Sequence, residues 1–414
     1  MLAAYALLVL LPAVRHPDTH GFAAYYAAAR VLLTAPTDLA RVYDNTWFQS
    51  QIDADGFRHV RDIYNVQPPT MALLLTPFAW LPPETARALW VAVGAICWVL
   101  GCRSLARALG ITSKDGHATL LVVAATSLFL PLRDNFRQGQ CYAFLFFLLA
   151  LHLELDLRRD SRSAWLAGLP LGAMLILKQA GVWLALLLLL SGRWRTVLAA
   201  AATTLAVAVL VSPWVGTDAW SAFLAALPSL AHSPERYVSA YQTVGGLFGH
   251  LFVYDATSNP EPAIHMPILA PVATATVVLI GIVQSVRLGR LSGSSHAEGA
   301  LSLGMFAALI VTVAPIAESY HYCLVLPSLI IAWWWAFTTR SPATSWVVLT
   351  TATLLLATTY SMYGWARIQA GGWALFAYPR VYGAFLLWGW LGSAVAALPR
   401  RHGAATLSAS AAPL

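Results

Sequence analysis

The sequence predicts an all-α integral membrane protein, a polytopic helical bundle of about twelve transmembrane helices. Two observations carry this prediction. Of the 414 residues, 59% are hydrophobic and only 10% are charged, with a mean hydropathy of +0.66, whereas a soluble domain carries roughly a quarter charged residues. In addition, the apolar residues form long runs separated by short arginine-bearing connections. A water-soluble globular protein is excluded, because the few polar side chains could not cover its surface.

The apolar runs have about the length of one membrane crossing, or are somewhat shorter. They fall at residues 2–14, 86–102, 117–132, 141–157, 164–177, 180–191, 196–212, 267–286, 299–316, 322–338, 345–360 and 381–398. The stretch from Pro68 to Leu81 lies between two Pro-Pro pairs, which favours a re-entrant or interfacial helix. We therefore expect one polytopic domain over residues 1–403, with an uncleaved first span, and a short disordered tail at 404–414.

The distribution of basic residues orients the bundle. With the N-terminus in the cytoplasm, thirteen basic and five acidic residues lie inside, and twelve basic and thirteen acidic residues lie outside. Every inner loop carries a basic residue, and the outer ones concentrate in two long loops that translocate regardless of charge. We expect a multi-pass membrane protein with both termini in the cytoplasm.

The two long outer loops, residues 15–87 and 213–266, are where function is expected, since loops of this length are usually functional. Each contains an amphipathic stretch, at residues 21–34 and 219–230. We expect these stretches to lie in the membrane interface, anchored by Tyr25, Tyr26 and Trp220.

Asp18 is the first candidate catalytic residue. It follows the first span directly and precedes a predicted helix, so its carboxylate could act as a general base toward a hydroxyl, with His20 close enough to tune it. The alternative is that Asp18 only caps the helix. Farther along the same loop, Tyr64 and Asn65 could line a substrate groove, or this segment could simply turn the chain back into the bilayer.

Cations and a histidine gather on the same side of the membrane. Arg133 and Arg137 suit phosphate oxygens, because a guanidinium donates paired hydrogen bonds and stays charged, although an ion pair with Asp134 is the alternative. Lys178 adds a further cation, or snorkels to the surface. At the outer end of a later span, His321 could contact a phosphate while Glu318 orients it, or the histidine could be structural.

Metal and cofactor signatures are absent from the sequence. The four cysteines, Cys97, Cys102, Cys141 and Cys323, show no paired spacing, and no Gly-rich phosphate loop or Cys/His zinc pattern occurs. We expect no metal, no cofactor and no nucleic-acid partner. The cysteines are interpreted as small hydrophobic residues.

Several motifs in register resemble a known family. They are Phe22-x-x-Tyr25-Tyr26-x-Ala28-Ala29-Arg30, Val42-Tyr43-Asp44, Pro68-Pro69-Thr70 with its continuation to Pro82, Gly139-Gln140, Gly168 to Lys178, and Ser319-Tyr320-His321-Tyr322. Together they resemble glycosyltransferase family 87, integral-membrane transferases of the GT-C type that take mannose from polyprenyl-phosphate mannose. The resemblance implies a catalytic aspartate in the first outer loop, a lipid-phosphate donor and inversion at the sugar carbon.

The chain departs from this family pattern at two positions. Family members carry an aspartate directly before the phenylalanine, where this chain has Gly21. Asp18 is the nearest acid, and Asp62 and Asp44 are the reserve candidates. The Lys-Pro of the family is Lys178-Gln179 here, so the correspondence at this motif depends on the lysine alone.

Residues and resemblance together predict a membrane glycosyltransferase that moves a hexose, mannose by resemblance, to a hydroxyl of a glycolipid or lipid-linked glycan on the outer face. The candidate catalytic residues are Asp18, with Asp62 and Asp44 in reserve, His20, His321 and Glu318. The donor-phosphate contacts are Arg133, Arg137, Lys178 and Gln140, and the substrate groove is formed by Tyr25, Tyr26, Tyr64, Asn65 and Tyr320. The alternative is a non-enzymatic carrier or flippase for a lipid-linked sugar, which needs the cations but no base.

Overall fold

The computed structural model describes residues 10–15, 19–65, 67–111, 126–232, 237–291 and 295–398. Within these ranges the regular structure is helical, and β pairing is limited to the isolated bridges Asp255–Asn259 and Pro262–Gly371. The all-α prediction is confirmed. Asp18, most of the run at 2–14, the start of the run at 117–132 and the tail at 404–414 lie outside the described residues.

The helices of the first half begin at the end of the first predicted run and continue through the predicted outer loop into the bundle. They are α2 (Leu11–Arg15), α3 (Phe22–Thr34), η2 (Pro36–Tyr43), α4 (Asn45–Ala54), α5 (Pro69–Ala79), α6 (Pro83–Ala108), α8 (Leu130–Gln138), α9 (Tyr142–Asp156), α10 (Ser161–Lys178), α11 (Val182–Leu190) and α12 (Trp194–Val215).

The second half returns to the bundle after a second outer segment. Its helices are α13 (Thr217–His232), α14 (Val244–Phe252), α15 (Leu269–Leu291), α16 (His296–Ile310), η5 (Ser319–Val325), α17 (Leu326–Thr338), α18 (Ala343–Leu356), α19 (Tyr360–Tyr363), η6 (Ala366–Gln369), η7 (Gly372–Ala377) and α20 (Pro379–Ala397).

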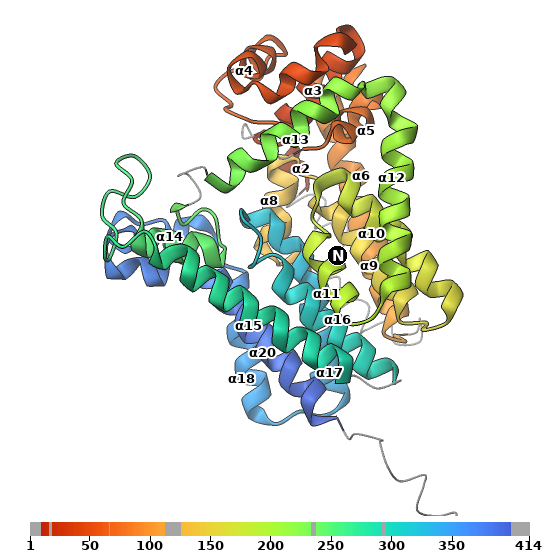
Figure 1. Ribbon diagram of the computed structural model, residues 1–414, viewed down its shortest axis with the longest axis vertical. Helices are drawn as coiled ribbons and strands as arrows, with labels where there is room; N and C mark the ends of the chain where they lie inside the picture. Colours follow the sequence, from red (N-terminus) through yellow and green to blue (C-terminus); the bar gives the residue numbers. More distant parts are fainter. Residues whose placement is uncertain are drawn as a thin grey trace, which may run out of the picture.

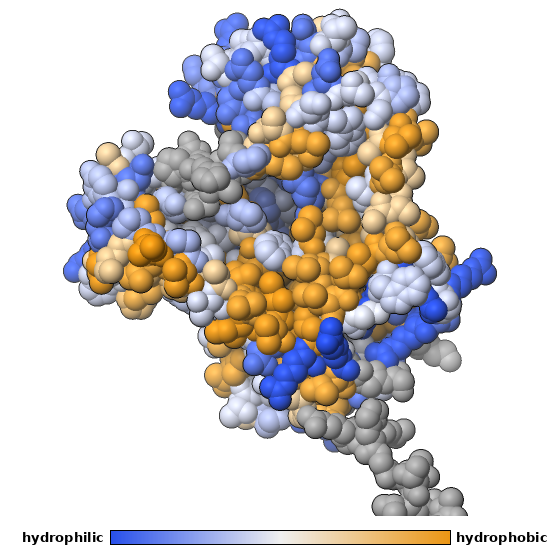
Figure 2. All heavy atoms as spheres, viewed as in Figure 1, coloured by the Kyte–Doolittle hydropathy of each residue, from blue (hydrophilic) through white to orange (hydrophobic). Residues whose placement is uncertain are grey.

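Within the described ranges, four segments are long and apolar enough to cross a membrane. They are Pro83–Ala108, Trp194–Val215, Leu269–Leu291 and Ser319–Thr338. An apolar surface covers the middle of the molecule, and a hydrophilic surface covers the lobe above it (Figure 2). Helices also occupy the other predicted runs wherever the structure describes them, but several are short, such as α11 with nine residues. A count of about twelve crossings therefore stays a prediction.

Helices α10 and α12 pack closely because glycines line the contact. A Cβ atom added at Gly168 would lie 2.6 Å from the carbonyl oxygen of Thr196, and one at Gly172 would lie 2.6 Å from that of Ala200. Small residues let helix backbones approach in this way within membrane bundles. This close contact fixes the position of α10, which ends at Lys178.

Ion pairs connect helices at the predicted inner end. Glu154 on α9 accepts from Arg107 at 2.7 Å and from Arg158 at 3.2 Å, and Asp156 pairs with Arg193 at the start of α12. These contacts link α6, α9 and α12. The four cysteines are free and buried, as the sequence predicts.

The first outer loop folds into a compact lobe with α13, at the top of Figure 1. Ten of the thirteen residues of α3 are buried, since α5 and η2 pack against it. The prediction that Tyr25 and Tyr26 anchor this helix in the membrane interface is wrong: both rings are enclosed by protein, with 0% and 4% of their surfaces exposed. Trp220 on α13 is partly exposed and donates from Nε1 to the Ser212 hydroxyl at 3.1 Å.

Candidate functional site

The carboxylate of Asp62 lies at the N-terminus of α3. It accepts hydrogen bonds from the backbone N–H groups of Gly21 at 2.5 Å and Ala24 at 3.2 Å. These donors belong to the first helical turn, whose amides have no partner within the helix and carry a partial positive charge. Asp62 comes from a loop 41 residues farther along the chain than Gly21. A long-range contact therefore positions this carboxylate.

The surroundings of Asp62 make its carboxylate more basic than a free one. Burial raises the pKa of Asp62, and the positive charge of His20 together with the backbone donors of Gly21, Ala24 and Ile63 lowers it in part. The His20 Nδ1 atom lies 3.8 Å from the carboxylate and donates to the carbonyl oxygen of Arg61 at 2.9 Å. A raised pKa suits a general base.

Gly21 occupies a position that accepts no side chain. Its φ is +97°, and a Cβ atom there would lie 2.0 Å from Nε2 of Gln140. An aspartate directly before Phe22, as the resemblance implies, would therefore collide with Gln140. Asp62 instead supplies a carboxylate to the backbone N–H of the same residue.

Gln140 joins this region to Lys178. The hydroxyl of Tyr25 donates to Oε1 of Gln140 at 2.6 Å, and the Lys178 ammonium donates to the Tyr25 hydroxyl at 3.4 Å. Lys178 is only 8% exposed. In the described part of the chain its hydrogen bond goes to Tyr25 rather than to a carboxylate, so its charge can pair with a ligand anion.

A large cavity of about 1010 Å³ connects these groups. Its polar lining residues include Asp62, His20, Gln140, Lys178, Glu318, Tyr320 and His321. Its apolar lining residues include Val182, Trp183, Ile310, Val311 and Leu324. The cavity thus combines charged and apolar side chains in one space.

His321 is oriented by its own turn. Its Nδ1 accepts the backbone N–H of Glu318 at 3.1 Å, which leaves Nε2 as the protonated nitrogen of a neutral ring. The ring packs against Tyr142 with centroids 4.4 Å apart. Glu318 accepts from the hydroxyl of Tyr320 at 2.8 Å. Partial burial raises the pKa of Glu318, and the positive charge of His20 opposes this effect.

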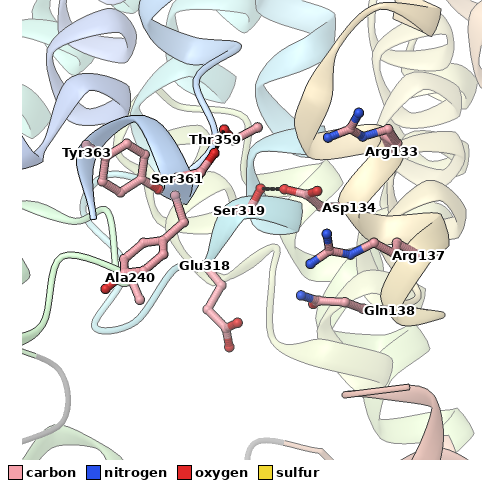
Figure 3. Close-up of a pocket in the computed structure, with 11 residues that line it drawn as sticks. Arg133, Asp134, Arg137, Gln138, Ala240, Glu318, Ser319, Thr359, Ser361 and Tyr363 are labelled. Carbon is pink, nitrogen blue, oxygen red and sulfur yellow. Dashed lines mark hydrogen bonds between the residues drawn. The ribbon is translucent and has the colours of Figure 1, made fainter. Parts of the chain in front are cut away.

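A second, smaller pocket of about 450 Å³ adjoins the first. Arg133 and Arg137 extend into it from α8, facing Thr359, Ser361 and Tyr363 (Figure 3). Glu318 lines both spaces. The four predicted phosphate contacts are therefore divided, with Lys178 and Gln140 in the large cavity and the two arginines in the small pocket. Asp134, the alternative ion-pair partner of these arginines in the sequence analysis, accepts a hydrogen bond from the Ser319 hydroxyl.

A profile comparison assigns the chain to a family. The profile of glycosyltransferase family 87 matches residues 65–315, more than half of the chain. The chain belongs to glycosyltransferase family 87. No solved structure matches it significantly.

Curated relatives of this family 87 chain come from mycobacteria. An alpha-(1->3)-arabinofuranosyltransferase of Mycobacterium tuberculosis is 30% identical over 206 residues, which are 47% of this chain and 47% of the relative. The chain thus matches about half the length of that relative. A polyprenol-phosphate-mannose-dependent alpha-(1-2)-phosphatidylinositol mannoside mannosyltransferase of Mycolicibacterium smegmatis is 24% identical over 381 residues, 84% of this chain and 83% of the relative.

Other residues that the sequence suggests for the site lie elsewhere in the family 87 fold. Asp44 is exposed and caps α4, accepting from the backbone of Thr46 and Trp47 at 3.0 and 3.2 Å. Tyr25, Tyr26 and Tyr64 are buried in the core and do not line the cavity. Asn65 is partly buried and likewise absent from its lining. Of the predicted groove residues, Tyr320 lines the cavity, and the other tyrosines pack inside the lobe next to small residues.

The cavity residues that the sequence-based site misses include Gln49, Gln67 and Tyr142. Gln49 accepts the backbone N–H of Asp62 at 3.4 Å and donates to the Val60 carbonyl at 2.8 Å. Gln67 is 4% exposed with a side-chain oxygen that lacks a partner, and Tyr142 contacts His321. Only Gln67 carried a signal, since it directly precedes Pro68-Pro69. Within the described residues, no three His, Cys, Asp or Glu side chains form a metal-binding group.

Proposed function

We propose that this family 87 chain transfers a hexose, mannose in the first instance, from a polyprenyl-phosphate sugar to a hydroxyl of a glycolipid or lipid-linked glycan, with inversion. One observation carries the proposal. A buried carboxylate, a buried lysine and a neutral histidine line one cavity that apolar side chains also line. A lipid-linked sugar phosphate needs both kinds of contact.

Asp62 is the general base in this proposal, in place of the first candidate Asp18, which lies outside the described residues. Asp62 lines the cavity and is held by the amides of α3. It removes the proton of the acceptor hydroxyl as that oxygen attacks the anomeric carbon, and the bond from that carbon to the phosphate oxygen breaks. A single displacement inverts the centre, so a β-linked donor gives an α-glycoside.

Lys178 stabilises the leaving phosphate in this proposal, together with Gln140 and the Nε2–H of His321. A buried ammonium interacts more strongly with an anion than an exposed one does, because the low surrounding dielectric screens it less. The apolar side chains of the cavity hold the first prenyl units. Since the phosphate leaves already charged, positioning, one base and these donors account for the reaction.

The proposed location is the bacterial cytoplasmic membrane, with both termini in the cytoplasm and the cavity on the outer face. The charge distribution of the short loops supports this orientation. Mannose is proposed because the mannosyltransferase relative aligns over 84% of this chain. The arabinofuranosyltransferase relative makes a pentose donor the first alternative to test.

The test is sugar transfer in membranes that contain the full chain. Radiolabelled polyprenyl-phosphate mannose or arabinose is supplied with a lipid extract, and the parent is compared with Asp62→Asn, Asp18→Asn and Asp44→Asn at matched expression. The proposal requires labelled product that is lost with Asp62→Asn and kept with Asp44→Asn. If labelled product is lost only with Asp18→Asn, the proposed transferase activity stands and Asp18 is the general base. Label that is bound or moved across the bilayer without product would identify a carrier instead.

A further inference from the structure

The two adjoining spaces differ in chemistry, and this difference assigns a ligand to the smaller one. Aliphatic side chains such as Val182, Ile310 and Leu324 line the large cavity, whereas Ala240 is the only aliphatic residue among the described residues that line the small pocket. We propose that the small pocket binds the anionic head group of the acceptor, a glycan that carries a phosphate or carboxylate. This inference depends on the proposed function, because it names the acceptor class of that reaction.

Two arginines supply the anion-binding surface of the small pocket. Arg133 and Arg137 lie one helical turn apart on α8 and extend into the same space (Figure 3). Asp134, on the same turn, accepts a hydrogen bond from Ser319. Two guanidinium groups at this spacing can each donate paired hydrogen bonds to one phosphate.

Hydroxyl groups form the opposite wall. Thr359 and Ser361 hydrogen-bond each other at 2.7 Å between their side-chain oxygens, and the Tyr363 ring lies beside them. Hydroxyls both donate and accept, which suits the hydroxyls of a sugar or an inositol ring. The pocket therefore presents charge on one wall and neutral polar groups on the other.

A third arginine lies behind this wall. Arg380 is 0% exposed, its guanidinium donates to the carbonyl oxygen of Thr358, and its Cζ lies 5.7 Å from the centre of the Tyr363 ring. Its Nε and Nη1 atoms have no hydrogen-bond partner. A buried cation without a carboxylate partner is costly by itself. A bound anion nearby would offset that cost.

The position of the pocket fits an acceptor better than a donor. The small pocket offers a prenyl chain much less apolar surface than the large cavity does. Glu318 lines both spaces, so a ligand whose head group contacts the arginines can extend a hydroxyl past Glu318 toward Asp62. Donor and acceptor then meet from two sides.

Binding measurements on the full chain in phosphatidylcholine nanodiscs test this assignment. Farnesyl phosphate serves as the donor-like probe, and glycerophosphoinositol, which has a phosphodiester and a ring of hydroxyls but no lipid chain, serves as the acceptor-like probe. The variants are Arg133→Gln with Arg137→Gln, and Lys178→Gln. Arg195→Gln is the matched control, since this exposed arginine lies at the start of α12 and stacks on Trp194.

The arginine double variant should weaken binding of glycerophosphoinositol by about tenfold or more, the loss expected when charge-assisted hydrogen bonds disappear. Its binding of farnesyl phosphate should stay within about twofold, and Lys178→Gln should show the opposite pattern. Glycerophosphoinositol that does not bind the parent, or binds the double variant equally well, overturns the assignment. Farnesyl phosphate lost with the arginines would place the donor phosphate in the small pocket and also overturn it.

The same experiment separates this inference from the proposed function. A parent chain that neither binds farnesyl phosphate nor transfers sugar removes the proposed function. Arginine-dependent binding of glycerophosphoinositol under those conditions would still establish an anion site in the small pocket, without an acceptor role.

Discussion

Helices α3 and α15 are both apolar, but protein buries most of α3 and little of α15. In α3, ten of thirteen residues are buried within the protein, whereas in α15 only Ala270, Gly281 and Ser285 are buried among 23 residues. The contrast teaches that an apolar sequence shows only that a helix avoids water. Whether protein or lipid covers it depends on which neighbours can approach.

Residue size explains the difference. Helix α3 is rich in alanine, so α5 and η2 pack closely around it and hold its N-terminus against Asp62. Helix α15 exposes branched aliphatic side chains such as Val272 and Leu279, and it contacts protein through small residues and a few partly buried aliphatic side chains such as Ile282. Ser285, for example, accepts from Nε1 of Trp388 at 2.9 Å. The first helix shapes a site, and the second presents a surface to lipid.

The largest difference between substitutions on α3 and α15 is expected in the rate of sugar transfer. Asp62→Asn removes the proposed base at the N-terminus of α3, and sugar transfer should fall by roughly 10²–10⁴-fold. The isosteric amide still accepts from the α3 backbone, so the protein should remain folded. Initial rates in membranes at matched expression measure the effect. Leu279→Ala on α15 is the control and should leave the rate unchanged, and equal losses in both variants would contradict a catalytic role for Asp62.

Glycine substitutions should separate the helices by stability. Gly21→Ala combines a φ of +97° with a Cβ atom 2.0 Å from Gln140, and we expect a loss of about 3 kcal/mol of unfolding free energy together with activity. Gly281→Ala on α15 meets only the end of the Leu309 side chain at 3.1 Å, so its cost should be below about 1 kcal/mol. Thermal unfolding in detergent compares them. Equal costs would mean that α3 is as loosely packed as α15.

Alanine-to-leucine substitutions test the same contrast in mid-helix. Ala27 is 0% exposed, so Ala27→Leu should destabilise the protein by about 1–3 kcal/mol through overpacking. Ala275 on α15 is exposed, so Ala275→Leu should change stability by less than about 0.5 kcal/mol. Unfolding of both variants in the same detergent measures the pair. A larger cost at Ala275 would indicate a protein partner on α15.

The smallest expected effect is a shift in pH dependence. Burial raises the pKa of Asp62 and the positive charge of His20 lowers it, while Arg61, Lys178 and Glu318 are the other charged groups among the described residues that line the cavity. His20→Ala should raise the pKa of Asp62 further and move the acidic limb of the pH–rate profile to higher pH. An unmoved limb would mean that another group limits the rate.

The stability of the fold responds to Asp62 in a definite direction. Because the folded-state pKa of Asp62 is raised, the stability contributed by this group is present at pH values below the unfolded pKa and is lost as the pH rises through the folded pKa. Asp62→Asn should abolish this part of the pH dependence. Unfolding curves of the parent and the variant across the acidic range test it.

The helical architecture was predictable because apolar runs and basic connections are local features of the sequence. Lys178, Glu318 and His321 were also found in this way, each at the end of an apolar run, and the structure places all three around one cavity. The proposed choice of Asp62 as the general base, over Asp18 and Asp44, was not predictable from the sequence. It depends on a contact across 41 residues between Asp62 and Gly21, which no local pattern records.

The division of the predicted cations between two pockets could not be predicted from the sequence for a similar reason. Arg133, Arg137 and Lys178 share one predicted side of the membrane, but sidedness does not resolve two neighbouring spaces. Glu318 separates them in the fold. The burial of Tyr25 and Tyr26 was also missed, because an alanine-rich amphipathic stretch looks the same at a membrane surface and inside a lobe.

The hydrogen bond from Gly21 to Asp62 has a consequence for how related sequences are compared. An alignment column records order along the chain, whereas the amides of α3 respond only to where a carboxylate lies in space. On the proposed function, a survey that asks for an acid directly before Phe22 would classify this chain as inactive. On this function, the carboxylate comes from a residue 41 positions after Gly21 and still lies at the N-terminus of α3. Family members with a glycine at this column should therefore be searched for an acid in the loop that reaches the same amide.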